Sequence, residues 1–422
     1  MRTKLSIAVV LAAVLALVAV SGAWPATEYP RVREPIPVSS ERAFADDPYA
    51  AQSRAALLLG LGALLCVGNR SAECADLKPA ELVPAEDLER LGLPPSLLGL
   101  ADQKPERFGI GSLREQLSGL AAGKAPADLK PEEVLGMEAR AYRRLSDGWQ
   151  RRDAALAILV GLEDPDPLVQ VAAACSLPHA TEDAGARELT VPRLARAAAS
   201  GDDLLREVAA TCLARQDPEN EALRPLVGGP KLEQAAKPAH TSLIVHGTWA
   251  ANGTWWPPGG DFHSYLAGWV ADLYALSDAY FWSGAWSDGE RRAAATQLFD
   301  WAAARTSDCL NVWAHSHGGN VVFLASVGVN RAPMEFGRAV LLSVPVHRNR
   351  YWPDFDRFES LAAVRARMDL VVMADLGGQK FDDPRIEDLP LTVWFDHSAS
   401  HEEAEWISHG LQFRLPVEVC VP

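Results

Sequence analysis

The sequence predicts an α/β fold in the C-terminal part of the chain and an all-α region before it. Between residues 242 and 395, short apolar runs alternate with helical patterns, which favours a mainly parallel sheet joined by crossover helices. Residues 76–227 are instead rich in Ala and Leu, are punctuated by Pro and have hardly any strand-like run. The chain has 422 residues, of which 48% are hydrophobic, and this is enough for two folded domains with real cores.

The N-terminus predicts an exported protein. Arg2 and Lys4 precede an apolar run over residues 5–20, and small residues follow at 21–23, where a signal peptidase would cut. We therefore expect a cleavable signal peptide over residues 1–23 of a secreted or periplasmic protein. Because the apolar run is short for a membrane span, an uncleaved membrane anchor is the alternative. Residues 24–75 form an N-terminal segment, in which the apolar stretch 55–67 is expected to be a buried helix.

The helical region over residues 76–227 contains an internal repeat. Five residues recur at a spacing of 37: Leu168, Val171, Ala172, Ala173 and Cys175 return as Leu205, Val208, Ala209, Ala210 and Cys212. Each copy follows an acidic turn. The pattern resembles HEAT-type helical repeats, which often present a surface to a protein partner, with a plain helical bundle as the alternative. Residues 228–238 begin with Gly-Gly-Pro and are expected to link this region to an α/β domain over residues 239–422.

Six strands are expected in the α/β domain. They are the apolar runs at residues 242–246, 279–282, 310–314, 339–344, 369–374 and 391–395. Helical patterns separate these runs, so consecutive strands should be parallel and joined by right-handed crossovers.

The segment Ala314-His315-Ser316-His317-Gly318-Gly319 reads as a turn that exposes a serine nucleophile. It lies between the strand-like run 310–314 and a helix-like run that begins at about residue 317. A serine hydroxyl is a poor nucleophile at neutral pH. A serine hydrolase therefore holds it at a sharp strand-to-helix turn, within reach of a base and beside free backbone N–H groups. The small residues around Ser316 make such a turn possible.

With Ala314 in place of the usual first glycine and two glycines after the serine, this segment resembles the Ala-x-Ser-x-Gly-Gly elbow of small lid-less bacterial lipases and esterases of the α/β-hydrolase superfamily. The resemblance covers residues 240–415 approximately. It implies a minimal α/β-hydrolase fold with Ser316 as the nucleophile. A domain of this length leaves little chain for a lid, so we expect an open site.

The run at 242–246 leads into His246-Gly247-Thr248-Trp249, which is similar to the start of the oxyanion loop in the same superfamily. The resemblance implies that backbone N–H groups of Thr248 or Trp249, together with that of His317, face the developing oxyanion. His246 is expected to pack or to fix the loop.

The loop over residues 249–262 carries Trp255 and Trp256 close to this segment. These two side chains are candidates for an apolar wall that binds an acyl chain, with ordinary loop packing as the alternative.

The acid and the base should follow in that order, each after a strand. We expect Asp375, after the run 369–374, to be the acid, with Asp382 and Asp383 in the same loop as alternatives. We expect His397, directly after the run 391–395, to be the base. His401 is the first alternative to His397, and His409 is a more distant one.

Composition limits the partners and cofactors. The net charge of −15 argues against nucleic acid and against electrostatic docking on anionic membranes. The six cysteines include no Cys-x-x-Cys pair and, with the histidines, give no zinc spacing, so we expect no metal and no cofactor. Cys66 and Cys74 are close enough to close a small loop in an oxidising compartment, and Cys309 and Cys420 could pair only if the fold brings them together.

The sequence thus predicts an exported serine hydrolase that cleaves a small-molecule or lipid ester through Ser316, His397 and Asp375. Cleavage of an amide or a thioester would use the same groups. The alternatives are an acyltransferase with the same triad, or an inactive hydrolase fold that carries a helical-repeat module for binding a protein.

Overall fold

The computed structural model describes residues 28–69, 74, 78–121, 123–124, 128–181, 183, 185–228, 242–305 and 309–415. The predicted signal peptide and nearly all of the predicted linker therefore lie outside the described residues. Within the described part, helices dominate up to residue 228, and all five strands follow it.

The N-terminal part is built of helices, as the Ala- and Leu-rich composition predicts. Their bounds are η1 (Glu41–Phe44), α2 (Pro48–Gly68), α3 (Pro79–Leu82), α4 (Ala85–Arg90), η2 (Pro95–Ala101), α5 (Ile110–Leu120), α6 (Pro131–Ser146), α7 (Arg151–Gly161), α8 (Pro167–Ala180), α9 (Gly185–Ala198), α10 (Asp203–Gln216) and η4 (Glu221–Leu226). Asp47, Asp166 and Asp202 cap α2, α8 and α10 by accepting backbone N–H groups of the first turn.

Helix α2 is the central helix of this part. It contains the apolar stretch predicted as a buried helix, and nearly all of its residues are buried, largely against α8. By length and composition alone α2 could cross a membrane, but 94% of its most apolar window is buried inside the protein. Its packing against α8 crosses the boundary predicted at residues 75 and 76.

The C-terminal part holds a five-stranded parallel sheet with the strand order β1-β2-β3-β4-β5. The strands are β1 (Ser242–Val245), β2 (Cys309–His315), β3 (Glu335–Leu342), β4 (Phe358–Arg367) and β5 (Ile386–Trp394). The remaining elements are α11 (Asp261–Ala267), α12 (Asp288–Arg305), α13 (His317–Ser326), η5 (Phe355–Arg357), α14 (Leu370–Ala374), η6 (His397–His401), α15 (Glu403–His409) and α16 (Leu411–Arg414).

Alternate residues of each strand pack into two different cores. Val312 and Leu341 face α12 and α13, whereas Trp313 and Leu342 face α11, α15 and α16. Helices therefore cover both faces, which is what a parallel sheet requires.

Two of the six predicted strands are absent from the structure, and one observed strand was not predicted. Residues 369–374 do not form a strand: Asp369 is the N-cap of the short helix α14, and the other five residues form that helix. The fourth strand is Phe358–Arg367, which was not predicted. This strand carries three Ala, two Arg and a Glu, a composition that does not favour a strand, yet it lies between β3 and β5 with its middle buried. Residues 279–282 form no strand. They lie in a loop in which Tyr280 and Trp282 are buried, and the segment before them makes a single bridge, from Leu273 to Ser242.

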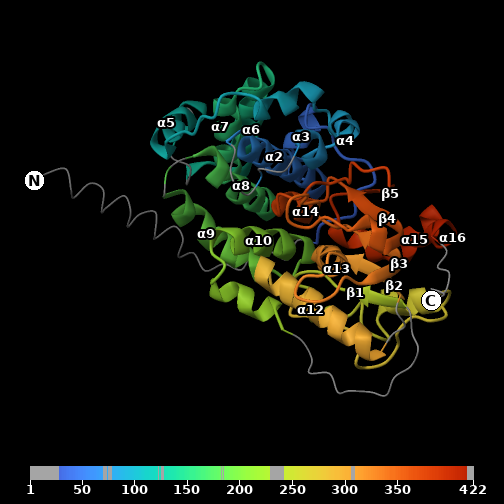
Figure 1. The fold of residues 1–422 in the computed structure, drawn as a ribbon. Coiled ribbons are helices and arrows are strands. Elements are labelled where there is room, and N and C mark those ends of the chain that lie inside the picture. The colour runs from blue at the N-terminus through green and yellow to red at the C-terminus, as the bar shows by residue number, and fades with distance from the viewer. Residues whose placement is uncertain are drawn as a thin grey trace, which may run out of the picture.

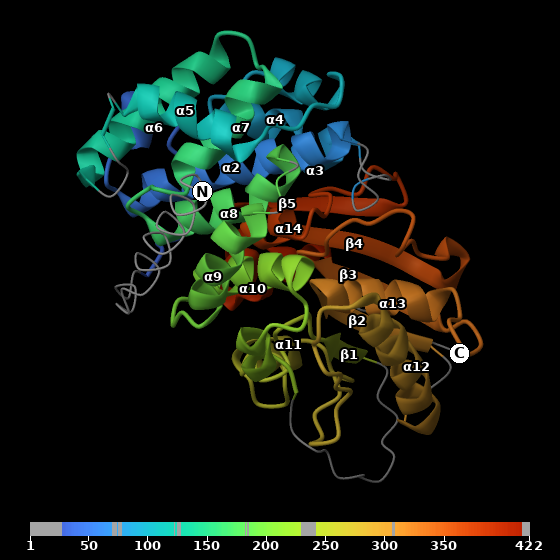
Figure 2. The same ribbon diagram turned by 90° about the vertical axis from the view of Figure 1, so that its left-hand side faces the viewer.

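The helical part packs directly on one end of the sheet. Figures 1 and 2 show helices α2 to α8 gathered on one side of the molecule and the sheet with α12 and α13 on the other, with α10 and α14 between them. Residues of α2, α8, α10 and α14 belong to one continuous hydrophobic core, which also includes Trp394 and Phe395 at the end of β5. The carboxyl end of the sheet is therefore covered by helices.

Two disulfides join parts of the helical region. Cys66 is bonded to Cys74, the pair that the sequence suggested, and Cys175 is bonded to Cys212, a pair that was not predicted. Cys175 and Cys212 are the equivalent positions of the internal repeat, on α8 and α10, so this bond fixes the two copies of the repeat to each other. Cys420 and the side chain of Cys309 lie outside the described residues.

Candidate active site

Ser316 lies at a sharp turn between β2 and α13, at the carboxyl end of the sheet. Its φ of 52° and ψ of −134° are unusual for a residue with a side chain, and such strain is kept where the surroundings enforce it. The Ser316 backbone N–H donates to Leu342 O at 2.8 Å, which ties the turn to the end of β3. Ser316 itself is 4% exposed.

The glycines near Ser316 are needed because backbone approaches closely here. A Cβ on Gly318 would lie 2.5 Å from Val245 O, and one on Gly319 would lie 2.4 Å from a methyl carbon of Val344. A Cβ on Gly247 would lie 2.6 Å from the Cβ of Ser316. The loop after β1 and the turn after β2 are therefore in direct contact.

We expect Gly247→Ala to damage this contact, because the new methyl group must displace Ser316 or its turn. Overpacking of this kind costs about 1–3 kcal/mol of unfolding free energy. Thermal unfolding measures that cost, and Gly99→Ala is the control because a Cβ at Gly99 meets nothing within 4 Å. Equal stability of the two variants would contradict the expected tight fit.

His397 begins the short helix η6 after β5 and is also 4% exposed. Its Nδ1 lies 2.7 Å from Oδ2 of Asp369, which is buried at the start of α14. The second oxygen of Asp369, Oδ1, accepts the backbone N–H groups of Val371 and Val372 and so caps α14. Asp369 is therefore held on one side while it orients the imidazole on the other.

The charges around His397 favour its protonated form. Burial alone lowers the pKa of His397, but the charge and hydrogen bond of Asp369, with smaller contributions from Glu207 and Asp396, outweigh burial and raise it. Neutral imidazoles of His315 and His401 pack against this cluster, with the His315 ring centroid 4.6 Å from that of His397. Burial lowers the pKa of both, that of His401 to about 3.

Ser316 and His397 line one small cavity of about 10 Å³, which is about the space that one water molecule needs. The other lining residues come from the loop after β1, from α10, from the loop after β3 and from α14: Glu207, Thr211, Thr248, Trp249, His317, Pro345, Val371, Val372 and Asp375. The structure differs from the open site that was expected, because α10 adds Glu207 and Thr211 to the walls of a small cavity lined mostly by buried residues. Burial raises the pKa of Glu207 to about 7, although the charge of His397 acts in the opposite direction.

The acid predicted at Asp375 is not in contact with His397. Asp375 Oδ2 lies 2.7 Å from His347 Nε2 and 3.1 Å from His317 Nε2, while Oδ1 accepts from Trp286 Nε1 at 2.9 Å. Burial would raise the pKa of Asp375, but the two imidazoles outweigh burial and hold it well below its usual value. Asp375 thus lines the cavity but orients other histidines.

The alternative acids lie farther away. Asp382 is largely exposed and pairs with Lys78, and Asp383 pairs with Arg385. The residue that does contact His397, Asp369, was not predicted as a site residue, because it was interpreted as the first residue of a strand over 369–374. An Asp directly before a short apolar run is also the pattern of a helix N-cap, and that is the signal that could have found it.

The alternative histidines have other contacts. His401 stacks on Trp255 with ring centroids 3.9 Å apart and an interplanar angle of 7°. His409 Nε2 accepts the backbone N–H of Thr392, at the far side of the loop. Neither residue lines the cavity with Ser316.

Of the predicted oxyanion donors, Trp249 is already engaged, since its backbone N–H donates to Gly284 O at 3.0 Å. Within the described part of the chain, the backbone N–H groups of Thr248 and His317 have no acceptor, and both residues line the cavity. His246 is buried between Trp256 and Trp282, as expected of a packing residue, and burial lowers its pKa to about 4.

The two tryptophans predicted to bind substrate do not line the cavity of Ser316. Trp255 packs against His315 and His401, beside the His397 loop. Trp256 lines a separate cavity of about 250 Å³, together with Pro257, Pro258 and Ala279 among others.

No cluster of three or more His, Cys, Asp or Glu side chains suited to a metal ion occurs among the residues that the structure describes. A comparison of the chain with models of known families, with curated proteins and with solved structures gave no match.

Proposed function

We propose that the protein is a serine hydrolase that cleaves carboxylic esters, with Ser316 as nucleophile, His397 as general base and Asp369 as the acid that orients His397. The observation that carries this proposal is the shared cavity: a serine on a strained turn and a buried histidine bound to a carboxylate line the same space. The chain order of serine, acid and histidine, each after a parallel strand, supports an α/β-hydrolase type of fold.

In this mechanism His397 accepts the proton of the Ser316 hydroxyl as the oxygen attacks the ester carbonyl. Asp369, bound to Nδ1, leaves Nε2 of His397 as the proton acceptor and stabilises the imidazolium that forms. Backbone N–H groups of Thr248 and His317 are the donors for the oxyanion. His397 then gives its proton to the leaving alcohol, and water cleaves the acyl-enzyme in the same manner.

The disulfides of the helical region bear on the compartment in which the protein is proposed to work. Two disulfides in the helical region support an oxidising compartment and hence an exported protein, with residues 1–23 as the signal peptide.

Helices α8 and α10, which carry the two copies of the repeat, pack against each other, and this supports a HEAT-type arrangement that could bind a protein partner.

Labelling with a fluorophosphonate, which reacts with an activated serine, tests the proposed function. We expect the mature protein to be labelled and the Ser316→Ala variant to remain unlabelled, because the probe phosphonylates only a serine whose proton a base can accept. A folded wild-type protein without label would contradict the proposal and favour a binding module that does not turn over. For a labelled protein, product analysis with and without an added alcohol separates a hydrolase from an acyltransferase.

A further inference from the structure

The first described residues of the chain lie against the loop that follows β5 and carries His397. We define residues 29–33 as the N-terminal strap. Val32 pairs antiparallel with Trp394 at the end of β5, where Trp394 donates its backbone N–H to Val32 O at 2.8 Å. Val32 is 1% exposed, so the strap is packed against the protein on this side. The pairing lies three residues before His397 in the chain.

The strap is also attached to the helical part. The Tyr29 hydroxyl donates to Asp166 at 2.8 Å and accepts the backbone N–H of Leu168, and the Tyr29 backbone N–H donates to Asp202 at 3.2 Å. Asp166 and Asp202 cap α8 and α10. The strap therefore connects α10, which helps to close the cavity, with the loop that carries His397.

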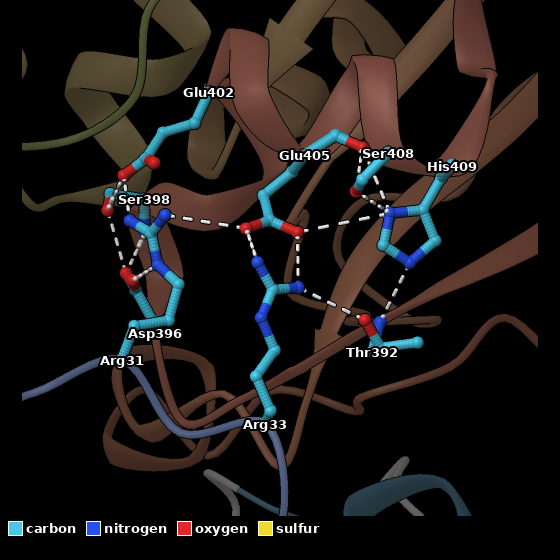
Figure 3. Close-up of polar contacts among 9 residues, drawn as sticks. All are labelled: Arg31, Arg33, Thr392, Asp396, Ser398, Glu402, Glu405, Ser408 and His409. Atoms are coloured by element: carbon cyan, nitrogen blue, oxygen red, sulfur yellow. Dashed lines mark hydrogen bonds and ion pairs between the residues drawn. The ribbon is translucent and has the colours of Figure 1, made fainter.

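Two arginines of the strap contact the acidic groups around this loop, as Figure 3 shows. Arg31 lies between three carboxylates: its Nε donates to Asp396 Oδ2 at 3.1 Å, and its terminal nitrogens contact Glu402 and Glu405. Arg33 donates twice to Glu405, at 2.7 and 2.5 Å, and once to the Thr392 hydroxyl at 3.1 Å. Glu405 is fully buried, so its negative charge needs these cations. Unlike Arg31, Arg33 makes no contact with Asp396.

Asp396 is the residue next to His397 and the N-cap of η6. Its Oδ1 accepts from the backbone N–H and the hydroxyl of Ser398, at 2.9 and 2.7 Å. Its Oδ2 accepts from Arg31. Arg31 and Ser398 thus fix both oxygens of the side chain that starts the turn on which His397 stands.

We propose that Arg31 is a positioning residue for His397: by holding Asp396 it keeps the imidazole of His397 in the cavity with Ser316. This inference rests on the proposed function, since it assigns a role to Arg31 only if His397 is the base. The second arginine of the strap serves stability, because it pairs the buried Glu405.

Arg31 should affect the pKa of His397, and this effect can be measured separately from its effect on stability. The groups that face His397 are Asp369 on α14, Glu207 on α10, Asp396 in its own loop, His315 at the end of β2 and His401 in η6. Arg31 offsets the negative charge of Asp396. Without Arg31, that carboxylate should favour the imidazolium of His397 more strongly and raise the pKa of His397 further.

The test compares Arg31→Ala with Arg33→Ala in the full mature protein. The readouts are the second-order rate constant of fluorophosphonate labelling across pH and the thermal unfolding temperature. We expect Arg31→Ala to lower the rate constant by about ten- to a hundredfold, the loss that a small displacement of a catalytic group causes. Its acidic limb, where protonation of His397 stops the reaction, should move to higher pH.

Arg33→Ala is the matched control. It removes three hydrogen bonds and leaves the carboxylate of Glu405 with the 3.4 Å contact to Arg31 and the 3.9 Å contact to Nδ1 of His409, so it should lower the unfolding temperature at least as much as Arg31→Ala does. Its labelling rate and acidic limb should stay at the wild-type values. Arg31→Lys keeps the charge near Asp396 and should bring the acidic limb back, with partial recovery of the rate.

If both alanine variants lose rate in proportion to stability, with no change in the acidic limb, the strap is only structural and the inference is wrong. An unlabelled wild-type protein is a different outcome, since it contradicts the proposed function itself.

Discussion

Replacing His397 by alanine is expected to lower the rate of ester cleavage by about 10⁶-fold, the loss seen when the base of a serine triad is removed. Without the imidazole, the Ser316 hydroxyl keeps its proton. No other described side chain that lines the cavity is hydrogen-bonded to the carboxylate of Asp369. Replacing His401 should cost far less, because that ring stacks on Trp255 and does not line the cavity.

The measurement is the rate of hydrolysis of a short-chain nitrophenyl ester by both variants, or the fluorophosphonate labelling rate where hydrolysis is slow. The pH dependence of the wild-type protein gives a second check. The base must be neutral to accept a proton, so the rate should fall as the pH drops through the pKa of His397, which lies above its usual 6.5. Matching unfolding temperatures exclude misfolding as the cause. A large loss in His401→Ala with a small one in His397→Ala would assign the base to His401.

The sequence predicted those parts of the fold and of the site that depend on local patterns. The turn at Ser316 could be predicted because close approach requires small residues at fixed positions around it, and the structure has Gly318 and Gly319 close to Val245 and Val344. The helices of the N-terminal part could be predicted in the same way, from composition and from the periodic placement of Ala and Leu.

Features that depend on neighbours distant in the chain were missed. Strand β4 is buried because β3 and β5 lie on either side of it, and its arginines are paired with Asp87 and Asp388, so a helix-like composition is accepted there. The apolar residues after Asp369 form a single helical turn because they pack against α2 and α10. No local pattern contains this information.

The walls of the cavity also depend on residues that are distant in the chain. Glu207 and Thr211 lie about a hundred residues before Ser316, in a region that composition separates from the sheet, and only the packing of α10 against α14 brings them to the cavity. The disulfide between Cys175 and Cys212 holds α10 to α8 in that position. An account of the site that began at residue 239 would therefore lack one of its walls.

Replacing Asp369 by asparagine is expected to lower the rate of ester cleavage by about 10⁴-fold, as the loss of the carboxylate does in other serine triads. An amide in place of the carboxylate can donate to Nδ1, which would leave the proton of His397 on Nε2, the nitrogen that must accept one. The asparagine oxygen can still accept from Val371 and Val372, so the cap of α14 should persist. Loss of the negative charge should also lower the pKa of His397 and move the acidic limb of the rate to lower pH.

Asp375→Asn is the matched control, because it removes a second buried carboxylate from the same cavity. Asp375 holds His317, His347 and Trp286 and has no bond to His397, so its loss should act mainly on stability. Unfolding a variant in which one of these buried donors loses its acceptor should take about 1–3 kcal/mol less free energy than wild type. The folded fraction of Asp375→Asn should react much faster than Asp369→Asn, with the acidic limb close to that of wild type. The reverse order of the two rates would return the role of the acid to Asp375, and the 2.7 Å bond between Asp369 and His397 would then serve only to fix the loop.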